Sequence, residues 1–420
     1  MIRSLQASGP MYEFVVTLFV AVGSVFALLL VIIVLGKAWR EAVERRQRRR
    51  RAELEPALFK YVIGNEPITA HLPRGLGTAD HEVVEQIFFD LGRVVKGAVQ
   101  DRARDAFETL GFVDHYHGRL RSRRWWARAE AAEKLGLMGS AKATGGLVEA
   151  MSDPMSEVRV RAARALGSIG TTEALAPLVR ALRDPGRWSA IRVGGILIGA
   201  GDEAVEILLK DFPTMPRDAR ISAIDIFGRI RSLKAIPLLS SLLRSADADE
   251  RARAAFSLGS VGDPGCAPAL MEALRDPSWA VRAMAARALG RLKAEGSISA
   301  LCAALSDPEW WVRANAAEAL KNKGDMGRRA LLEMLDGSDT FASQQAVQML
   351  QESGVLDSLI SQLGSPETSK RQQALDVMAK MVKLRRTDLL TEIAHSHPES
   401  AIRQRLAIIL GLRPEPQPVG

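Results

Sequence analysis

The feature that most constrains the fold is a repeat of about 31 residues that runs through most of the chain. Residues 276–290 read DPSWAVRAMAARALG, and residues 307–320 read DPEWWVRANAAEAL. The closing step recurs 29–32 residues apart from residue 135 onward, as Leu135-Gly136, Leu166-Gly167, Ile198-Gly199, Phe227-Gly228, Leu258-Gly259 and Leu289-Gly290, then without glycine at Leu320, Leu350 and Met381, and again as Leu410-Gly411. A fixed period of this length over nearly 300 residues predicts a solenoid.

Each repeat predicts two helices. In residues 153–185 we expect Asp153 to cap the first helix and Pro154 to take its first position. Apolar residues from Val158 to Ile169 recur at helical spacing, and Gly167 and Gly170 are expected to end the helix by accepting positive φ. EALAPLVRAL, residues 173–182, is the second helix. One such hairpin cannot bury its own apolar face, so the predicted fold class is all-α, an α-solenoid of stacked hairpins.

The string V-R-x-x-A-A-x-A-L-G, followed by A-x-x-x-L-x-x-A-L, resembles HEAT repeats, in particular the short HEAT-like repeats also found in phycobilisome lyases. The match is best at residues 153–185, 247–275 and 276–320, and it is weaker but in phase at 122–152, 186–246 and 321–411. The resemblance implies a superhelical α-solenoid. Because HEAT-type arrays mostly bind other macromolecules, it also implies a binding function rather than a particular reaction.

A second feature is an uncharged apolar run of 22 residues, FVVTLFVAVGSVFALLLVIIVL, at residues 14–35. As a helix it would span about 33 Å, enough to cross a hydrocarbon core of about 30 Å. The apolar region of a cleaved signal peptide is about 7–15 residues long and ends in small residues. This run is longer and continues into GKAWREAVERRQRRRR, so we predict one N-terminal transmembrane helix over 14–36.

The net charge of +8 is concentrated directly after this run. The segment from Lys37 to Arg51 holds two acids and eight basic residues, which leaves +2 for the rest of the chain. Lys and Arg stay preferentially on the cytoplasmic side, so we predict an inner-membrane protein with its N-terminus outside and its solenoid in the cytoplasm. The Ala- and Arg-rich composition favours a bacterial source. The basic residues also form a candidate contact for anionic lipid at 37–51: Lys37, Arg40, Arg45, Arg46, Arg48, Arg49, Arg50 and Arg51.

These features divide the chain. The predicted segments are an extracytoplasmic N-terminus (1–13), the transmembrane helix (14–36), a basic juxtamembrane segment (37–52), a helical N-terminal cap (53–121), the HEAT-like solenoid (122–413) and a disordered tail (414–420). A cap is expected because a solenoid must cover its first apolar face. The tail, RPEPQPVG from residue 413, is rich in proline.

Arginine and tryptophan recur at fixed positions of the first helices. An arginine stands seven positions before the step residue, as Arg128, Arg159, Arg220, Arg251, Arg282, Arg313 and Arg403, and a tryptophan stands ten before it, as Trp125, Trp188, Trp279 and Trp310. Residues three apart share a helical face, so each pair is expected to stack, and the Asp that begins a repeat is within reach of the same guanidinium. Two interpretations remain open. The columns form either a structural Asp–Arg–Trp ladder or a ridge that docks a protein partner, with Trp126 and Trp311 as the less buried contact residues.

Little in the sequence points to catalysis, a metal or a cofactor. Two HxH pairs, His115/His117 and His395/His397, lie about 280 residues apart without an acidic or cysteine cluster beside them. We interpret them as surface histidines of turns. One HEAT-type enzyme family, deoxyhypusine hydroxylase, binds iron through repeated His-Glu pairs, but the single His-Glu here is His81-Glu82, outside the repeats. Phosphate-loop, nucleophile-elbow and dinucleotide-binding motifs are absent from the sequence.

We therefore expect no catalytic residue and no cofactor. The sequence predicts a membrane-anchored scaffold or adaptor that presents a cytoplasmic solenoid to a protein partner. One alternative, implied by the resemblance to phycobilisome lyases, is a bilin lyase or isomerase. The other is a membrane-tethered array that binds nucleic acid, against which the +2 balance outside the basic segment argues unless the arginine column faces one groove.

Overall fold

The computed structural model describes residues 9–64, 68, 78–94, 97–184, 186–337, 339–352, 354–384 and 388–412. Over these ranges the chain is helical, without a strand, and it divides into two compact units. Unit 1 comprises Met1–Gly146 and Pro154–Val158, and unit 2 comprises Leu147–Asp153 and Arg159–Gly420. The tail predicted to be disordered, 414–420, lies outside the described residues.

Unit 1 holds the apolar run and the predicted cap. Its helices are α1 (Gly9–Ile63), α2 (Thr78–Val94), α3 (Ala98–Thr109), α4 (Phe112–Arg119) and α5 (Trp125–Met138), followed by the start of α6 (Thr144–Ala150). Helices α2, α3 and α4 lie within residues 53–121, the range predicted as a cap, and α5, the first helix of the repeat array, belongs to the same unit.

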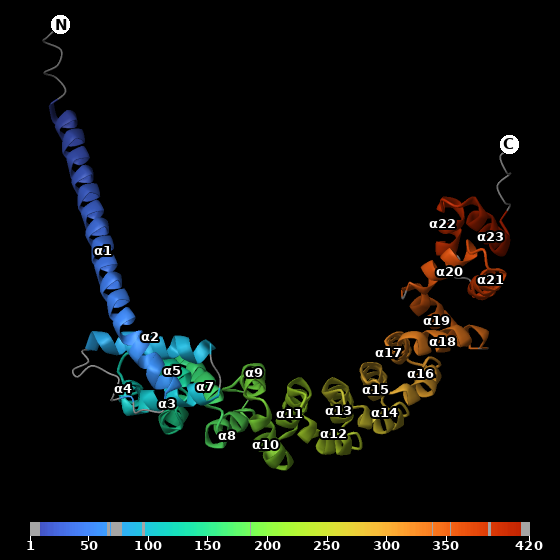
Figure 1. The fold of residues 1–420 in the computed structure, drawn as a ribbon, viewed down its shortest axis with the longest axis horizontal. Helices are drawn as coiled ribbons and strands as arrows, with labels where there is room; N and C mark the ends of the chain where they lie inside the picture. Colours follow the sequence, from blue (N-terminus) through green and yellow to red (C-terminus); the bar gives the residue numbers. More distant parts are fainter. Residues whose placement is uncertain are drawn as a thin grey trace, which may run out of the picture. The chain divides into compact units, whose positions relative to one another are not determined.

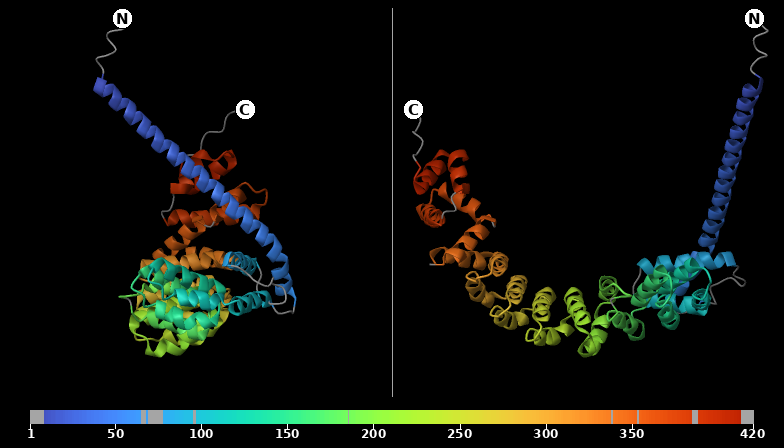
Figure 2. Two further views of the ribbon diagram at one scale, coloured as in Figure 1. Left: turned by 90° about the vertical axis from the view of Figure 1, so that its left-hand side faces the viewer. Right: turned by 180° about the vertical axis from the view of Figure 1, so that it is seen from behind.

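Helix α1 is continuous over 55 residues (Figure 2). The large apolar side chains from Phe14 to Leu35 are exposed along its first part, Phe19 to 80%. Its last turns bury Leu54, Leu58 and Val62, where α1 packs on α2 and α3. The basic segment 37–52 is therefore the middle of one helix, so the apolar run and the cap are joined without a loop.

Unit 2 is a stack of helical hairpins (Figure 1). Its helices are α7 (Ser156–Ile169), α8 (Thr172–Ala181), α9 (Ala190–Ala200), α10 (Asp202–Asp211), α11 (Arg217–Ile230), α12 (Ile236–Leu242), α13 (Ala248–Val261), α14 (Ala267–Ala273), α15 (Trp279–Arg291), α16 (Ile298–Ala304), α17 (Trp310–Lys321), α18 (Gly324–Glu333), α19 (Thr340–Glu352), α20 (Val355–Leu363), α21 (Thr368–Lys383), α22 (Asp388–Ser396) and α23 (Ser400–Leu410). The first helices α11, α13, α15 and α17 pack side by side in sequence order, and the second helices α12, α14 and α16 each pack against the first helix of the following repeat. The all-α solenoid is confirmed.

The core of unit 2 follows the predicted apolar face. In α15, Val281, Ala285 and Leu289 are fully buried, and Leu270 of α14 is buried beside them. Each buried leucine contributes about 1.5–3 kcal/mol relative to an exposed one. Alanines fill the positions where neighbouring first helices are closest, so the repeat stacks at short distance.

The step glycines allow that close approach. A Cβ on Gly259 would lie 2.5 Å from Ala288 Cα, and one on Gly290 would lie 2.7 Å from Ala319 Cα. The expectation that Gly167 ends its helix is wrong, because α7 continues to Ile169 and only Gly170 has positive φ, at 72°. Gly167 instead faces Ile196 of α9, where a Cβ would overlap that side chain.

The Asp-Pro that opens a repeat lies before the helix rather than at its start. Helix α7 begins at Ser156, so the prediction that Asp153 caps it and Pro154 takes its first position is wrong. The equivalent Asp276 shows why: its Oδ1 accepts the Ser278 N–H at 2.8 Å, two residues on, and α15 begins at Trp279. The aspartate closes the turn, which leaves its carboxylate free to bind an arginine as well.

Candidate protein-docking surface

The arginine column ties each first helix to the turn before it. Arg282 Nη1 donates to the carbonyl oxygens of Asp276 (2.9 Å) and Pro277 (3.2 Å), six and five residues earlier. The same bonds recur at the equivalent arginines, with the six-residue bond formed at 2.7–2.9 Å by Arg128, Arg159, Arg251, Arg313 and Arg403 and the five-residue bond formed at 3.1 Å by Arg220. Each guanidinium thus satisfies carbonyls that a helix end leaves unpaired.

The same arginines reach the repeat that follows. Arg251 donates through Nε and Nη2 to both oxygens of Asp276, at 2.7 and 2.9 Å. Arg282 makes the same forked contact with Asp307, at 2.6 and 2.9 Å. The side chains of this second pair are 14% and 10% exposed, so the pair is largely withdrawn from solvent. These contacts are the Asp–Arg part of the predicted ladder, and we call them rungs.

The rung carboxylates are held in their charged form. Burial raises the pKa of Asp276 and of Asp307, but the hydrogen bonds from Arg251 and Arg282, together with a backbone N–H on each aspartate, outweigh it. Both pKa values therefore lie below the usual range of an aspartate. The rungs are ion pairs at neutral pH.

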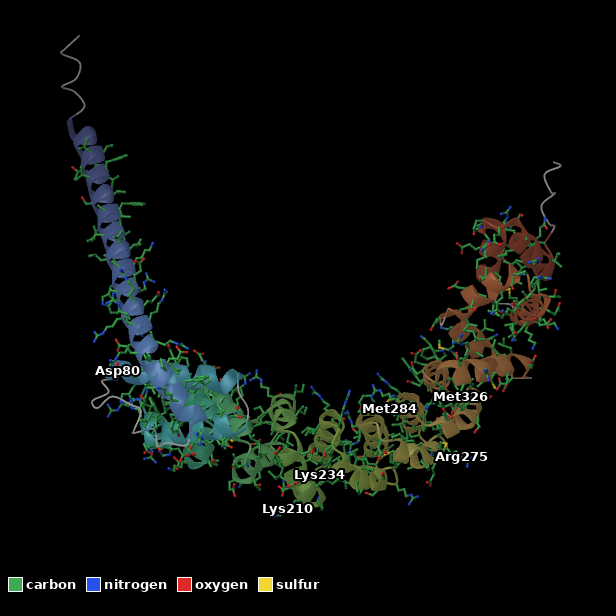
Figure 3. The ribbon with its side chains drawn as sticks, in the orientation of Figure 1. Asp80, Lys210, Lys234, Arg275, Met284 and Met326 are labelled. Carbon is green, nitrogen blue, oxygen red and sulfur yellow. The ribbon has the colours of Figure 1, made fainter. Side chains whose placement is uncertain are left out.

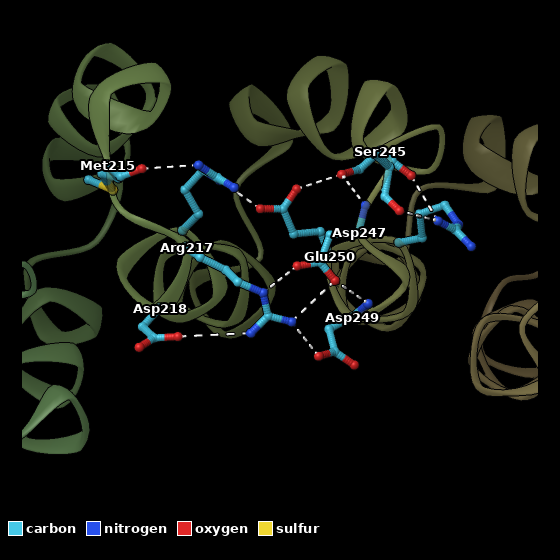
Figure 4. A network of polar contacts seen from close by, with 10 residues as sticks. Met215, Arg217, Asp218, Ser245, Asp247, Asp249 and Glu250 are labelled. Atoms are coloured by element: carbon cyan, nitrogen blue, oxygen red, sulfur yellow. Dashed lines mark hydrogen bonds and ion pairs between the residues drawn. The ribbon is translucent and has the colours of Figure 1, made fainter.

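Between α11 and α13 the rung becomes a network (Figure 4). Arg220 Nε binds Glu250, a carboxylate only 3% exposed, at 2.6 Å. Beside it, Arg217 reaches Asp247 at 2.5 Å and Asp249 at 2.6 Å. The hydrogen bond from Arg217, followed by backbone N–H donors, lowers the pKa of Asp247. Two arginines of α11 thus bind three carboxylates in or beside the first turn of α13, whereas Arg251 and Arg282 each bind one.

The Trp–Arg stacking expected within one helix is not the contact that Arg282 and Arg313 make. Arg282 is occupied by its rung, and the guanidinium carbon of Arg313 lies 5.1 Å from the ring centre of Phe341 in the next first helix. The carbonyl and carboxylate bonds set the direction of each guanidinium, so it points across the repeats and not back along its own helix.

The tryptophans are exposed instead. In unit 1, Trp125 and Trp126 are 45% and 48% exposed, and in unit 2 Trp279, Trp310 and Trp311 are 45%, 52% and 56% exposed. Trp188 is half-buried. Trp126 and Trp311, expected to be the less buried members of their doublets, are more exposed than their neighbours by only three and four percentage points. Both members stand in the first turn of a helix, before it enters the core.

Phe341 extends this surface, and the tryptophan column alone did not reveal it. It is 66% exposed and stands nine residues before Leu350, as Trp311 stands nine before Leu320. Trp279, Trp310, Trp311 and Phe341 lie at the N-terminal ends of α15, α17 and α19, which pack in that order. We call these four residues the aromatic stripe.

The basic segment of unit 1 is partly used within the protein. Arg50 donates to both oxygens of Asp80 in α2, at 2.7 and 3.1 Å, and Arg51 lies 2.8 Å from Asp90 of the same helix (Asp80 is labelled in Figure 3). Lys37, Arg45 and Arg48 form ion pairs with glutamates one turn away, and Arg40 bonds the Gly36 carbonyl. The expectation that all eight basic residues face lipid is therefore wrong for Arg50 and Arg51, which fasten α1 to the cap.

The histidines of the first HxH pair lie on helix α4, not in a turn. His115 and His81 border a hollow of about 410 Å³ in unit 1. Its inner wall holds Glu85, which accepts a hydrogen bond from the Tyr116 hydroxyl at 2.9 Å and pairs with the Lys134 ammonium at 2.6 Å. Burial, then the bond to Glu85, raises the pKa of Tyr116. These charged groups are matched to one another and join α2, α4 and α5. No group of three or more metal-ligating residues occurs over the described ranges.

Stacked two-helix repeats with a shared inner ladder define an α-solenoid. The sequence matches the profile of HEAT repeats at residues 117–193, 202–278, 236–321 and 267–351. These matches cover more than half of the chain, so the protein belongs to the HEAT-repeat family. None of the curated proteins matches it.

Several solved structures are similar to the chain. The complex of CpcE and CpcF of phycocyanin lyase from Nostoc sp. PCC7120 is 20% identical over 65% of this chain and 94% of that one, with a TM-score of 0.24. Human deoxyhypusine hydroxylase is 22% identical over 72% and 96%, with a TM-score of 0.26. The karyopherin Kap121p, bound to the C-terminus of the phosphatase Cdc14p, is 13% identical over 86% and 50%, with a TM-score of 0.43. Such similarity does not decide between binding and catalysis.

Proposed function

We propose that this protein is a membrane-anchored scaffold whose HEAT solenoid binds a protein partner through the aromatic stripe. A HEAT solenoid is suited to protein binding, because its repeats expose a long row of helices. The observation that carries the proposal is the exposure of Trp279, Trp310, Trp311 and Phe341 on three successive first helices. Tryptophan and other aromatic residues are favoured anchors of interfaces, and here four of them are exposed on neighbouring helices.

The anchor of the proposed scaffold is the first part of α1. It is the one helix of the described chain that is long and apolar enough to cross a membrane, with a mean hydropathy of 3.2 in its most apolar window and none of that window buried. The basic residues that follow favour a cytoplasmic location for both units and an extracytoplasmic N-terminus. Arg46 and Arg49, which have no ion-pair partner over the described residues, are the proposed contacts for anionic lipid headgroups.

Photo-crosslinking tests the stripe. A photoreactive amino acid at position 311 of the full-length protein in native membranes should give a discrete crosslinked adduct of one size. The matched control places the same amino acid at Leu233, which is 65% exposed but lies at the start of a second-helix segment. Adducts of the same pattern at both positions, or none at position 311, would count against the stripe as the docking surface.

Membrane extraction and protease protection test the anchor. The full-length protein should stay with membranes in alkaline carbonate, and it should be released only by detergent. Protease added to the cytoplasmic side should cut at exposed residues after Arg51, whereas protease on the other side should leave them intact. Extraction by carbonate, or the opposite protection pattern, contradicts the anchor or its orientation.

A further inference from the structure

Two arginines lie over one aromatic ring on the first helices of unit 2, and two more arginines stand on the neighbouring helix. Phe256 of α13 lies beneath Arg287 and Arg291 of α15, whose guanidinium carbons are 5.3 and 4.7 Å from the ring centre. Arg291 also donates to the Ser260 hydroxyl at 2.8 Å. Arg229 and Arg231 stand at the end of the neighbouring helix α11. We call Phe256, Arg229, Arg231, Arg287 and Arg291 the arginine patch.

These arginines lack the acidic partners that other arginines of the same helices have. Arg253 pairs with Asp225 at 2.5 Å, and Arg251 with Asp276 at 2.7 Å. The four patch arginines form no ion pair over the described residues. Burial, then the nearby charges of Arg287 and Arg231, lowers the pKa of Arg291. Like charges are gathered here, and no carboxylate of the described residues forms an ion pair with them.

The backbone conformation of Arg231 is a second, independent observation that points to a binding site. It has a φ of 62°, and it is the single non-glycine residue with positive φ among the described residues. The position four residues after the step is glycine with positive φ in other repeats, at Gly170, Gly262 and Gly354. A side chain at this conformation is disfavoured, and such strain persists where a function requires the side chain. At this one repeat, the chain has an arginine where glycine would fold more easily.

The patch adjoins a hollow of about 500 Å³ between α11, α13 and α15. Phe256, Ala252 and Met284 give it an apolar floor, and Figure 3 shows Met284 on the row of first helices, away from Lys210 and Lys234 on the other row. Asp225 and Asp249 also line the hollow, but each is bound to an arginine outside the patch. The unbalanced charge beside the apolar floor is therefore positive.

We propose that the arginine patch binds an acidic segment of the protein partner, in which Asp or Glu residues flank an apolar side chain. The carboxylates would take forked hydrogen bonds from Arg231, Arg287 and Arg291, and the apolar side chain would enter the hollow over Phe256 and Met284. This inference rests on the proposed scaffold function and names the chemistry of its partner. A nucleic acid fits less well, because the patch is short and the arginine column that could extend it is bound to carbonyls and carboxylates within the array.

A peptide titration tests the acidic segment. The probe is a fluorescent Glu-Glu-Leu-Glu-Glu peptide, titrated with detergent-solubilised full-length protein and followed by anisotropy. Binding should weaken at least tenfold when the glutamates are replaced by glutamine, and again in an Arg287→Glu, Arg291→Glu double variant. The matched control is Arg192→Glu, Arg329→Glu, which reverses two exposed charges of unit 2 outside the patch and should bind as the parent does. Equal binding of both peptides, equal loss in both variants, or a preference for a single-stranded oligonucleotide would overturn the proposal.

Arg231→Gly separates function from folding. Because glycine accepts positive φ, this variant should unfold at a higher temperature than the parent while it binds the acidic peptide more weakly. A variant that is more stable and binds equally well would remove Arg231 from the site. Photo-crosslinking at position 311 reads the scaffold function independently. If the crosslink forms but the peptide does not bind, the proposed acidic segment is wrong and the scaffold function stands. If the peptide binds but no crosslink forms at position 311, the patch stands as an acidic-peptide site and the docking surface of the scaffold proposal is wrong.

Discussion

Two sets of arginines on the same helices have opposite surroundings. On α13 and α15 the rung residues Arg251 and Arg282 are 13–14% exposed and each meets an aspartate of the next repeat. Arg287 and Arg291, five and nine residues further along α15, are exposed and meet an aromatic ring and a hydroxyl. The rungs join neighbouring repeats, whereas the patch leaves its charge available to a ligand. Arginines of the same helix thus have two roles: Arg282 joins neighbouring repeats, whereas Arg287 and Arg291 keep their positive charge at the surface.

This difference bears on the nucleic-acid alternative. That reading required the arginine column to face outward in one groove, but its guanidinium groups are bound to carbonyls and carboxylates within the array. The patch arginines form no ion pair over the described residues, but they stand beside acidic residues. The net charge of a sequence does not reveal which charged side chains form ion pairs within the folded protein.

Breaking one rung should have the largest effect on stability. Arg282→Met leaves Asp307 without its partner at 10% exposure and leaves two carbonyls unpaired. We expect a loss of about 3 kcal/mol, at the lower end of the range for breaking a buried pair because the site is not fully closed. Urea unfolding of the solubilised protein measures it. Arg192→Met, at an exposed position, is the control, and similar losses in the two variants would contradict the role of the rung.

Widening the contact between first helices should cost less. In Gly290→Ala the new Cβ would lie 2.7 Å from Ala319 Cα, so α15 and α17 must move apart. We expect a loss of about 1–3 kcal/mol, as for other overpacked cores. Gly296→Ala, where nothing lies within 4 Å of the new Cβ, is the matched control for thermal unfolding. A Gly290 variant as stable as this control would show that the step glycine is not needed for packing.

Lowering the pH should reduce the contribution of the rungs to stability. The pKa values of Asp276 and Asp307 are lowered in the folded state, mainly by their arginines acting against burial, so both aspartates bind protons less readily folded than unfolded. Their contribution is fully present well above the unfolded value of about 3.9, and it is lost as the pH falls through that value to the lower folded one. The unfolding midpoint measured from pH 6 to pH 3 should fall more in the parent than in Arg282→Met. Parallel curves would remove the rungs from the acid response.

Changing the patch should have the smallest effect on folding. Arg287→Gln removes an exposed charge that has no acidic partner, so the free energy of unfolding should change by no more than about 0.5 kcal/mol. The measurement is the same urea titration used for Arg282. A loss comparable to that of the rung variant would mean that the patch is structural, and the contrast between the two sets of arginines would disappear.

The sequence by itself determined the repeat, its helical hairpins and the apolar run. These follow from local spacing: a 31-residue period, an apolar face at helical intervals and 22 residues without charge are properties of the chain that no tertiary contact alters. Phe341 could also have been found from the sequence, because it occupies the position of Trp311 relative to the step. The exposure of the tryptophans followed partly from the same register, but the small difference in exposure within each doublet did not.

Only the tertiary structure decided what each charge does. Arg51 and Asp90 meet because α1 runs on past the apolar segment and packs against α2. Arg287 and Arg291 gather over Phe256 because α13 and α15 pack side by side, which brings together residues about 31 positions apart. A sequence shows that an arginine is present, whereas its partner depends on the rotation of one helix against the next. Pairing is therefore a property of the packed helices, and so is the difference between a rung and a free arginine.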